Sequence, residues 1–450
     1  MRLISCALFL AISVSAIAQN GNWQDLFNGK DLTGWKQLNG KAVYEVVDGT
    51  IRGTTVSNTP NSFLTTEKEY GDFILELEFL VDTSMNSGIQ IRSLSKPEYQ
   101  NGRVHGYQVE IDPSVRGWSG GIYDEARRGW LTTMEYNPPA KKAFKNGTWN
   151  KYRIEAIGNT IRTWVNGVPC SHLIDNMTAK GFIALQVHSI GKDVQPGKHI
   201  SWRNIRIQTE KLKPSPLDNI MVVNLVPNTI SSQEKKNGYS LIWSPGSTKG
   251  WRGAHKDQFP QKGWNVTDSV LAVVPSGGGE STNGGDIVTT QEFSAFDLQF
   301  EFKLAKGANS GVKYFVTENE KTQGSAIGLE YQVLDDDNHP DAKNGISGNR
   351  TLASLYDLIP RAKIAAALKK NGEWNRGRVV VYPDNRVEHW LNGFKVVEYT
   401  RGSDEFKRLV ANSKYKGFVN FGMAAKGRIL IQDHGDEVSY RSIKLKSLAR

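Results

Sequence analysis

The sequence predicts an all-β protein in which two tandem antiparallel sandwiches, or jelly rolls, follow a cleaved signal peptide. Apolar and polar residues alternate with a period of two over many short segments, as at Phe73, Leu75, Leu77 and Phe79. The 44 glycines among 450 residues supply the turns that many short strands need. Blocks of sequence also recur in the same order in the two halves, which indicates two related domains.

Residues 1–18 form the predicted signal peptide. Arg2 precedes a short apolar run that ends at the small-residue triplet Ala16-Ile17-Ala18, the pattern of a cleavage site. The run is shorter than the roughly 20 residues of a bilayer span, and no second such run follows, so we expect no transmembrane segment. The mature chain is therefore expected to be secreted or periplasmic. Only Cys170 remains after cleavage, so no internal disulfide is expected.

Composition and charge exclude several classes of protein. With 38% hydrophobic and 23% charged residues, the chain is unlike disordered or collagen-like sequences. The formal net charge of +10 is scattered rather than gathered into a basic stripe, so we expect no nucleic-acid partner. No histidine and cysteine spacing of a zinc site occurs, and Asp335-Asp-Asp-Asn338 is more typical of an acidic turn than of a cation site. We predict no metal and no cofactor, with a divalent cation as the open alternative.

The repeated blocks define the domain organisation. Asn86-Ser-Gly-Ile recurs as Asn309-Ser-Gly-Val, and the block over 181–188 recurs over 427–434. Recurrence of turn-forming residues alone would explain single blocks but not their shared order. Between the copies, the segment over 211–218 carries two prolines and marks the junction. We predict a first domain over 19–211, a linker over 212–235 and a second domain over 236–450.

Turn and helix signals complete the predicted elements. Asn166-Gly167 and Asn392-Gly393 each lie between strand-like runs, which predicts two hairpins. One helix is predicted, from Arg361 to Lys370 in the second copy.

Three predicted strands of the first copy carry unusual polar faces. Over 106–112, the polar residues Gln108, Glu110 and Asp112 share one side because strand side chains alternate. The same alternation over 88–92 and 181–188 separates further polar residues from apolar ones. If these faces line one concave sheet, a polar cleft results; the alternative is an ordinary solvated outer face. The expected cleft comprises Arg92, Gln108, Glu110, Asp112, Gln186 and His188.

At these residues the sequence resembles the 3-keto-disaccharide hydrolase family, whose fold is the concanavalin A-like lectin/glucanase jelly roll. The resemblance covers nearly all of the first copy and, more weakly, the second. The motifs that carry it are Leu26-Phe-Asn-Gly-Lys-Asp-Leu-Thr-Gly-Trp35, Asn86-Ser-Gly-Ile-Gln-Ile-Arg92, His105-Gly-Tyr-Gln-Val-Glu-Ile-Asp112, and Ser119-Gly-Gly-Ile-Tyr-Asp-Glu125 running into Arg127-Arg-Gly-Trp-Leu131.

The resemblance implies an oligosaccharide or glycoside substrate oxidised at C3, made by a separate sugar oxidoreductase. A C3 ketone acidifies the C2 proton, so a base can remove it and the group on C1 can leave; water addition would complete a net hydrolysis. Such a site needs a base, donors for the enolate oxygen and an acid for the leaving group. The candidates are Glu110 or His188 as base, Arg92 with Gln108 or Tyr123 for the enolate, and Asp112 or Glu125 as acid. Expected substrate-binding residues are Gln90, Gln108, Arg127, Arg128, Gln186, Trp118 and Trp130.

Two alternatives stay open. Glu110-Ile-Asp112 resembles the start of a jelly-roll endoglucanase signature, but Pro113, Ser114 and Val115 follow in place of the third carboxylate. A lectin-like module without catalysis is the second alternative, with exposed aromatic rings stacking on sugars.

The second copy departs from the first at its polar positions. Phe315 stands where the first copy has Arg92, and Glu330, Gln332 and Leu334 stand where it has Gln108, Glu110 and Asp112. The second copy therefore either works differently or has become a binding or scaffolding partner that shapes access to the first. We expect one active site rather than two. The candidates in the second copy are Glu330, Gln332, Tyr356, Asp357, Gln432 and His434.

Overall fold

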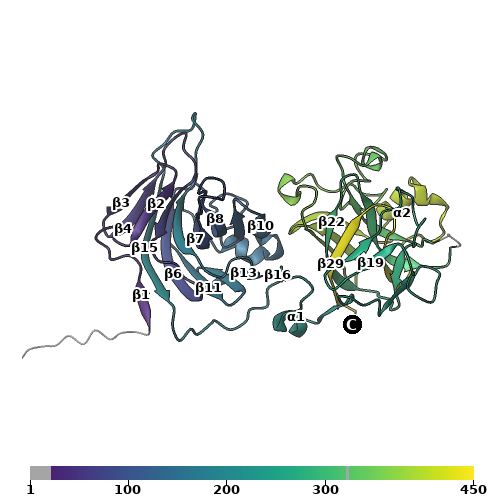
Figure 1. Ribbon diagram of the computed structural model, residues 1–450. Helices are drawn as coiled ribbons and strands as arrows, with labels where there is room; N and C mark the ends of the chain where they lie inside the picture. Colours follow the sequence, from purple (N-terminus) through teal and green to yellow (C-terminus); the bar gives the residue numbers. More distant parts are fainter. Residues whose placement is uncertain (1–21, 321–323, 450) are drawn as a thin grey trace, which may run out of the picture.

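The computed structural model describes residues 22–320 and 324–449, which form two β-sandwiches joined by a short connecting segment (Figure 1). The predicted signal peptide lies outside the described residues, so that prediction stays untested. Within the described ranges, none of the helices has the length and hydrophobicity to span a bilayer. The predicted all-β fold of two tandem jelly-roll sandwiches is confirmed.

The first sandwich packs a nine-stranded sheet against a seven-stranded sheet. The larger has the order β16-β13-β12-β11-β6-β15-β4-β3 with β1 beside β15, and the smaller has the order β10-β9-β8-β7-β14-β5-β2. The larger sheet contains β1 (Trp23–Asp25), β3 (Val43–Val47), β4 (Thr50–Thr54), β6 (Phe73–Val81), β11 (Asn150–Ile157), β12 (Thr160–Val165), β13 (Val168–Ile174), β15 (His199–Gln208) and β16 (Val222–Asn224). The smaller contains β2 (Trp35–Asn39), β5 (Ser62–Thr66), β7 (Ser87–Leu94), β8 (His105–Ile111), β9 (Ile122–Glu125), β10 (Gly129–Thr132) and β14 (Phe182–Val187).

The second sandwich has an eight-stranded and a five-stranded sheet. Their orders are β19-β20-β29-β22-β25-β26-β27 with β17 beside β29, and β18-β21-β28-β23-β24. The larger contains β17 (Tyr239–Leu241), β19 (Trp264–Val266), β20 (Leu271–Val273), β22 (Phe296–Leu304), β25 (Asn375–Val381), β26 (Arg386–Leu391), β27 (Phe394–Thr400) and β29 (Val438–Ser447). The smaller contains β18 (Trp251–Gly253), β21 (Ile287–Thr289), β23 (Asn309–Thr317), β24 (Ile327–Leu334) and β28 (Arg428–Ile431).

Over residues 22–320 and 324–449, helical structure is confined to short segments. The helices are α1 (Ser232–Lys236) and α2 (Asp404–Ala411), with 3-10 turns η1 (Met134–Tyr136), η2 (Pro138–Lys142), η3 (Pro340–Lys343), η4 (Ala365–Ala367) and η5 (Lys414–Gly417). Both predicted hairpins form, and at Asn392 and Gly393 both φ angles are positive (50° and 93°), as an Asn-Gly turn favours.

The predicted helix over 361–370 is wrong. Only η4 forms there, between extended residues Ile364 and Leu368. Before η4, the Ala362 amide donates to the Val396 carbonyl, and Asn392 Nδ2 donates to the Ala367 carbonyl. The segment is therefore bonded to the β26–β27 hairpin, and these tertiary contacts outweigh the helix propensity of its alanines and lysines.

The inward faces of the strands build the core as their alternation predicts. Phe73, Leu75 and Leu77 of β6 and Val109 and Ile111 of β8 are fully or almost fully buried in the same cluster. The opposite face of β8 is thereby left to Gln108 and Glu110. The alternation thus determines which side chains form the candidate site.

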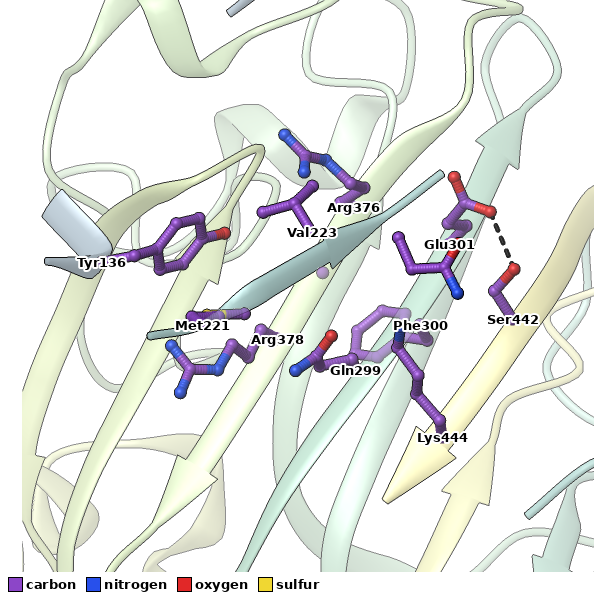
Figure 2. A pocket seen from close by; sticks show the side chains of 12 residues that line it. Tyr136, Met221, Val223, Gln299, Phe300, Glu301, Arg376, Arg378, Ser442 and Lys444 are labelled. Atoms are coloured by element: carbon purple, nitrogen blue, oxygen red, sulfur yellow. Dashed lines mark hydrogen bonds between the residues drawn. The ribbon is translucent and has the colours of Figure 1, made fainter. Parts of the chain in front are cut away.

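The connecting segment binds the two sandwiches together. Within the range predicted as linker, β16 pairs in parallel with β13, and α1 begins at Ser232 with a capping box between Ser231 and Glu234. Figure 2 shows Met221 and Val223 of this segment lying over the strand that carries Gln299 and Glu301 of the second sandwich. The same segment is therefore an edge strand for one sandwich and a cover for the other.

Direct contacts also join the sandwiches. The Tyr136 and Trp390 rings stack 5.0 Å apart, and Thr133 Oγ1 donates to the Gly393 carbonyl at 2.9 Å. Arg376 Nη2 donates to the Leu131 carbonyl at 2.8 Å. The tip of the β26–β27 hairpin is thus seated on the first sandwich.

Candidate functional site

A row of buried amides crosses the polar face of the seven-stranded sheet. Gln90 of β7 lies opposite Gln108 of β8, and β14 brings Gln186 to the other side of β7. Gln108 Oε1 accepts hydrogen bonds from Gln90 Nε2 at 2.7 Å and from Gln186 Nε2 at 2.8 Å. Within the described residues, the buried Gln186 Oε1 has no partner. The row therefore fixes the orientation of Gln108 and leaves one acceptor free.

Glu110 is the carboxylate that this row presents. Its side chain is only 4% exposed, and Gln108 Nε2 donates to Oε2 at 2.9 Å. Asn86 Nδ2 donates to Oε1 at 2.6 Å, and Arg116 Nη2 lies 3.4 Å from the same oxygen. Burial raises the pKa of Glu110 to about 7, and these donors offset only part of that effect. A carboxylate with this pKa can accept a proton near neutral pH.

Asp112 stabilises the loop that brings Arg116 to the site. Its carboxylate accepts from the Ser114 amide at 3.1 Å, the Trp118 amide at 3.2 Å and Arg116 Nε at 2.8 Å. Burial opposes ionisation, but the bonds from Ser114 and Arg116 outweigh it and lower the pKa of Asp112. The expectation that Asp112 protonates a leaving group is therefore corrected, because an acid with a lowered pKa is ionised at neutral pH.

Arg92 does not share the polar face, and its predicted role at an enolate is corrected. A β-bulge follows Ile91, and Arg92 has a φ of 45°. The side chain is 1% exposed and donates to the Gly71 carbonyl and the Gly158 carbonyl, each at 2.8 Å. Phe315 occupies the same bulge in the second sandwich, with a φ of 51° and 2% exposure. A position that accepts phenylalanine in one copy and a buried arginine in the other is an interior packing position.

Three other candidates lie on this sheet or directly after one of its strands. Tyr123 of β9 is opposite Gln108, and its pKa is raised by burial and by Glu125 and Glu110, so the phenol keeps its proton. Burial raises the pKa of Glu125, although Arg103 Nη2 lies 3.3 Å from its Oε1. His188 Nδ1 lies 2.8 Å from the Ser189 carbonyl, which can only accept, so Nε2 keeps a free lone pair in the neutral ring. These residues supply a donor, an acid and a second base.

Aromatic rings form a wall beside Glu110. The Arg116 guanidinium lies 4.2 Å from the Trp118 ring and 5.2 Å from the Trp130 ring. The ring centroids of Trp130 and Tyr123 are 5.2 Å apart, and those of Trp118 and Phe394 of the second sandwich are 5.4 Å apart. Phe394 of the second sandwich therefore packs against this wall, and the wall holds the Arg116 guanidinium through cation–π contacts.

Arg127 and Arg128 do not reach the Glu110 site, which corrects their predicted role there. They follow Ala126, whose φ is 57°, and both bond to the buried carboxylate of Asp124. Arg128 also pairs with Asp175 at 2.5 Å. Both arginines line a cleft of about 550 Å³ between the sandwiches instead.

The polar face of the second sandwich encloses a cavity of about 290 Å³. Asp357 lies outside its lining and is bonded to Arg350 Nε and to the Lys414 amide. Five of the predicted residues line it, namely Glu330, Gln332, Tyr356, Gln432 and His434, together with Lys313, Glu280 and Lys414, which the sequence reasoning missed. Lys313 could have been found, because the repeat places it at the position of Gln90.

Possible metal ligands occur together at one place in the described residues. His339, His434 and Asp436 each offer a ligand atom, and these atoms lie within 4.8 Å of one another. The acidic turn at Asp335 has another role, because this carboxylate accepts from the Gly307 amide and from Asn338.

The profile of the 3-keto-alpha-glucoside-1,2-lyase-like domain matches residues 22–208 and again residues 242–446. The chain belongs to this family. The resemblance of its motifs to 3-keto-disaccharide hydrolases is thereby confirmed, and both sandwiches are family domains.

The chain is also similar to individual proteins. A 3-keto-disaccharide hydrolase of Bacteroides thetaiotaomicron is 39% identical over 233 residues, which cover 47% of this chain and 79% of the relative. A crystal structure of a candidate glycosyl hydrolase from Parabacteroides distasonis is 32% identical, with a TM-score of 0.44, and covers 50% of this chain and 100% of its own. A second such structure from the same organism is 26% identical, with a TM-score of 0.32, and covers 44% and 99%.

Proposed function

We propose that the first sandwich cleaves glycosides oxidised at C3, with Glu110 as the base that removes the C2 proton. The observation that carries this proposal is the buried Glu110 carboxylate, with a pKa of about 7, held by Asn86, Gln108 and Arg116. These three donors orient the base, while burial keeps it basic enough to act.

The proposed reaction has two stages. Glu110 takes the C2 proton, and the electrons of the C2–H bond form an enolate whose negative charge lies on the C3 oxygen. The phenol of Tyr123 stabilises this oxygen. The enolate then collapses to restore the ketone, a C1–C2 double bond forms, and the C1–O bond breaks as Glu125 protonates the leaving oxygen. Addition of water across the double bond gives a net hydrolysis, and omission of that step gives elimination.

The proposal implies a partner reaction and a compartment. The substrate needs a ketone at C3, so an oxidation by a sugar oxidoreductase must precede this reaction. The signal-like sequence over 1–18 supports the proposal that the chain acts outside the cytoplasm.

Turnover of a 3-keto-glycoside in D₂O tests the mechanism. We expect deuterium at C2 of the hydrated product, or a 2-hydroxyglucal-type product if elimination is the end of the reaction, because the C2 proton is lost in either case. The unoxidised glycoside should not be cleaved. Cleavage without deuterium at C2 would indicate ordinary glycosidase chemistry, and binding without cleavage would indicate the lectin-like alternative.

Arg116→Gln tests the electrostatics of the base. Arg116 lowers the pKa of Glu110, so its removal should raise that pKa further. The base must be ionised to act, so kcat/KM should rise with pH. The midpoint of this rise should lie at about pH 7 in the native protein and about one pH unit higher in the variant. Arg116→Lys should bring the pH profile most of the way back to that of the native protein. Arg203→Gln, which removes an arginine of the other sheet, should leave the profile unchanged. An unchanged profile in Arg116→Gln would exclude Glu110 as the titrating base.

A further inference from the structure

The cavity of the second sandwich has a different arrangement of charge from the site of the first. Lys313 and Glu330 are opposite each other across β23 and β24, at the register that Gln90 and Gln108 occupy in the first sandwich. Gln332 stands at the register of Glu110. A lysine opposite a glutamate has thus replaced a pair of amides, and an amide that cannot accept a proton has replaced the carboxylate of the proposed base.

The charge of Lys313 is already balanced by protein groups. Its side chain is buried, and Nζ lies 3.6 Å from Glu280 and 3.6 Å from Asp286. Lys414 lies over the Tyr356 ring at 4.1 Å and near the Tyr415 ring. The cavity therefore offers no surplus of positive charge to an anionic ligand.

One buried acceptor of the cavity has no donor among the described residues. Gln432 is 5% exposed, and its Oε1 has no hydrogen-bond partner among the described residues. Glu330 is 4% exposed and also lines the cavity, where Lys313 and Lys414 favour its charged form. A buried acceptor without a donor is costly, so Gln432 favours a ligand that brings hydroxyl or water donors, and the Glu330 carboxylate can accept from the same hydroxyl groups.

Size and lining restrict the ligand further. A cavity of about 290 Å³ lies at the lower end of small-ligand sites, which suits one hexose unit rather than an oligosaccharide. Tyr356, Tyr415 and Phe418 supply aromatic surface against which a sugar ring can pack. A sugar carboxylate would lie near Glu330 and Glu280 and be repelled.

We propose that the second sandwich holds a saccharide site for one neutral hexose unit, recognised through its hydroxyl groups by Glu330 and Gln432. This site is separate from the Glu110 site and does not depend on the proposed cleavage reaction. It gives the tandem chain a second point of attachment to a glycan.

Calorimetric titration of the full chain with the methyl α-glycosides of glucose, galactose and mannose tests the site. At least one should bind saturably, and methyl α-D-glucuronide should bind at least about tenfold more weakly. Glu330→Gln and Gln432→Leu should each weaken binding of the neutral sugar by about tenfold or more. Glu330→Gln should also reduce the ratio of the affinities for the neutral sugar and the glucuronide. Arg203→Gln, on the other sheet of the first sandwich, should leave this binding unchanged, and Trp130→Ala should affect only binding at the Glu110 site. Melting temperatures of all variants identify any loss of binding that comes from unfolding.

Three results would overturn the proposal. These are no saturable binding of any of the three neutral glycosides, equal binding of the glucuronide, or binding that Trp130→Ala removes while folded Glu330→Gln and Gln432→Leu retain it. Turnover of 3-keto-glycosides, measured in parallel, reports on the Glu110 site alone, so failure of one proposal is distinguishable from failure of the other.

Discussion

Glu110→Gln should lower kcat for a 3-keto-glycoside by about 10³-fold while the protein stays folded. The amide has nearly the size and shape of the carboxylate, but it cannot take the C2 proton. KM should change little, because the substitution leaves the unpartnered Gln186 Oε1 and the aromatic wall in place. Single-turnover kinetics and thermal melting of the same preparation check both parts of this prediction.

Glu78→Gln is the matched control for this change. Glu78 lies on the other sheet, partly exposed, in an ion pair with Arg203 at 2.7 Å. This variant should turn over at the native rate. If Glu110→Gln keeps its turnover and His188→Asn loses it, the base is His188, whose Nε2 is the other free acceptor at this face. Retained turnover in both variants would remove this sheet from the proposed mechanism.

Strand alternation made most of the first site predictable from the sequence. It placed Gln90, Gln108, Glu110 and Gln186 on one face, and the structure joins three of them by hydrogen bonds to Gln108. Alternation holds only while the strand is regular. At the bulge after Ile91 the period of two is lost, so a prediction based on it fails there.

Residues outside the strands were less predictable. Arg116 lies in the loop after β8, and only the folded loop shows that Asp112 brings it to Glu110. Arg127 and Arg128 follow the positive-φ residue Ala126, and this turn directs them to Asp124. No periodic pattern in the sequence encodes such turns. The repeat held information that the motifs did not, since aligning Lys313 with Gln90 would have revealed the altered charge of the second cavity.

The bulge at Arg92 has the same close packing in both copies. An added Cβ at Gly181 would be 2.3 Å from the Ser93 carbonyl oxygen, and one at Gly427 would be 2.5 Å from the Phe315 carbonyl carbon in the second sandwich. Neither glycine can be replaced without moving a backbone. The bulge is therefore part of the shared fold, and residue 92 is constrained by packing whatever the chemistry of each half.

Arg92→Met should destabilise the protein by about 3 kcal/mol while the folded fraction keeps native turnover. Two buried carbonyls, at Gly71 and Gly158, lose their donors, and the ion pair with Asp72 at 3.0 Å is lost. These contacts connect the start of β6 to the turn between β11 and β12, far from the hydrogen bonds of Glu110. Urea unfolding should show the loss, and kcat per folded molecule should stay within about twofold of native. Arg92→Lys should recover part of the stability, because its ammonium can still donate to one or two of these acceptors. A variant that melts at the native temperature but turns over about 100-fold more slowly would instead place Arg92 at the enolate oxygen.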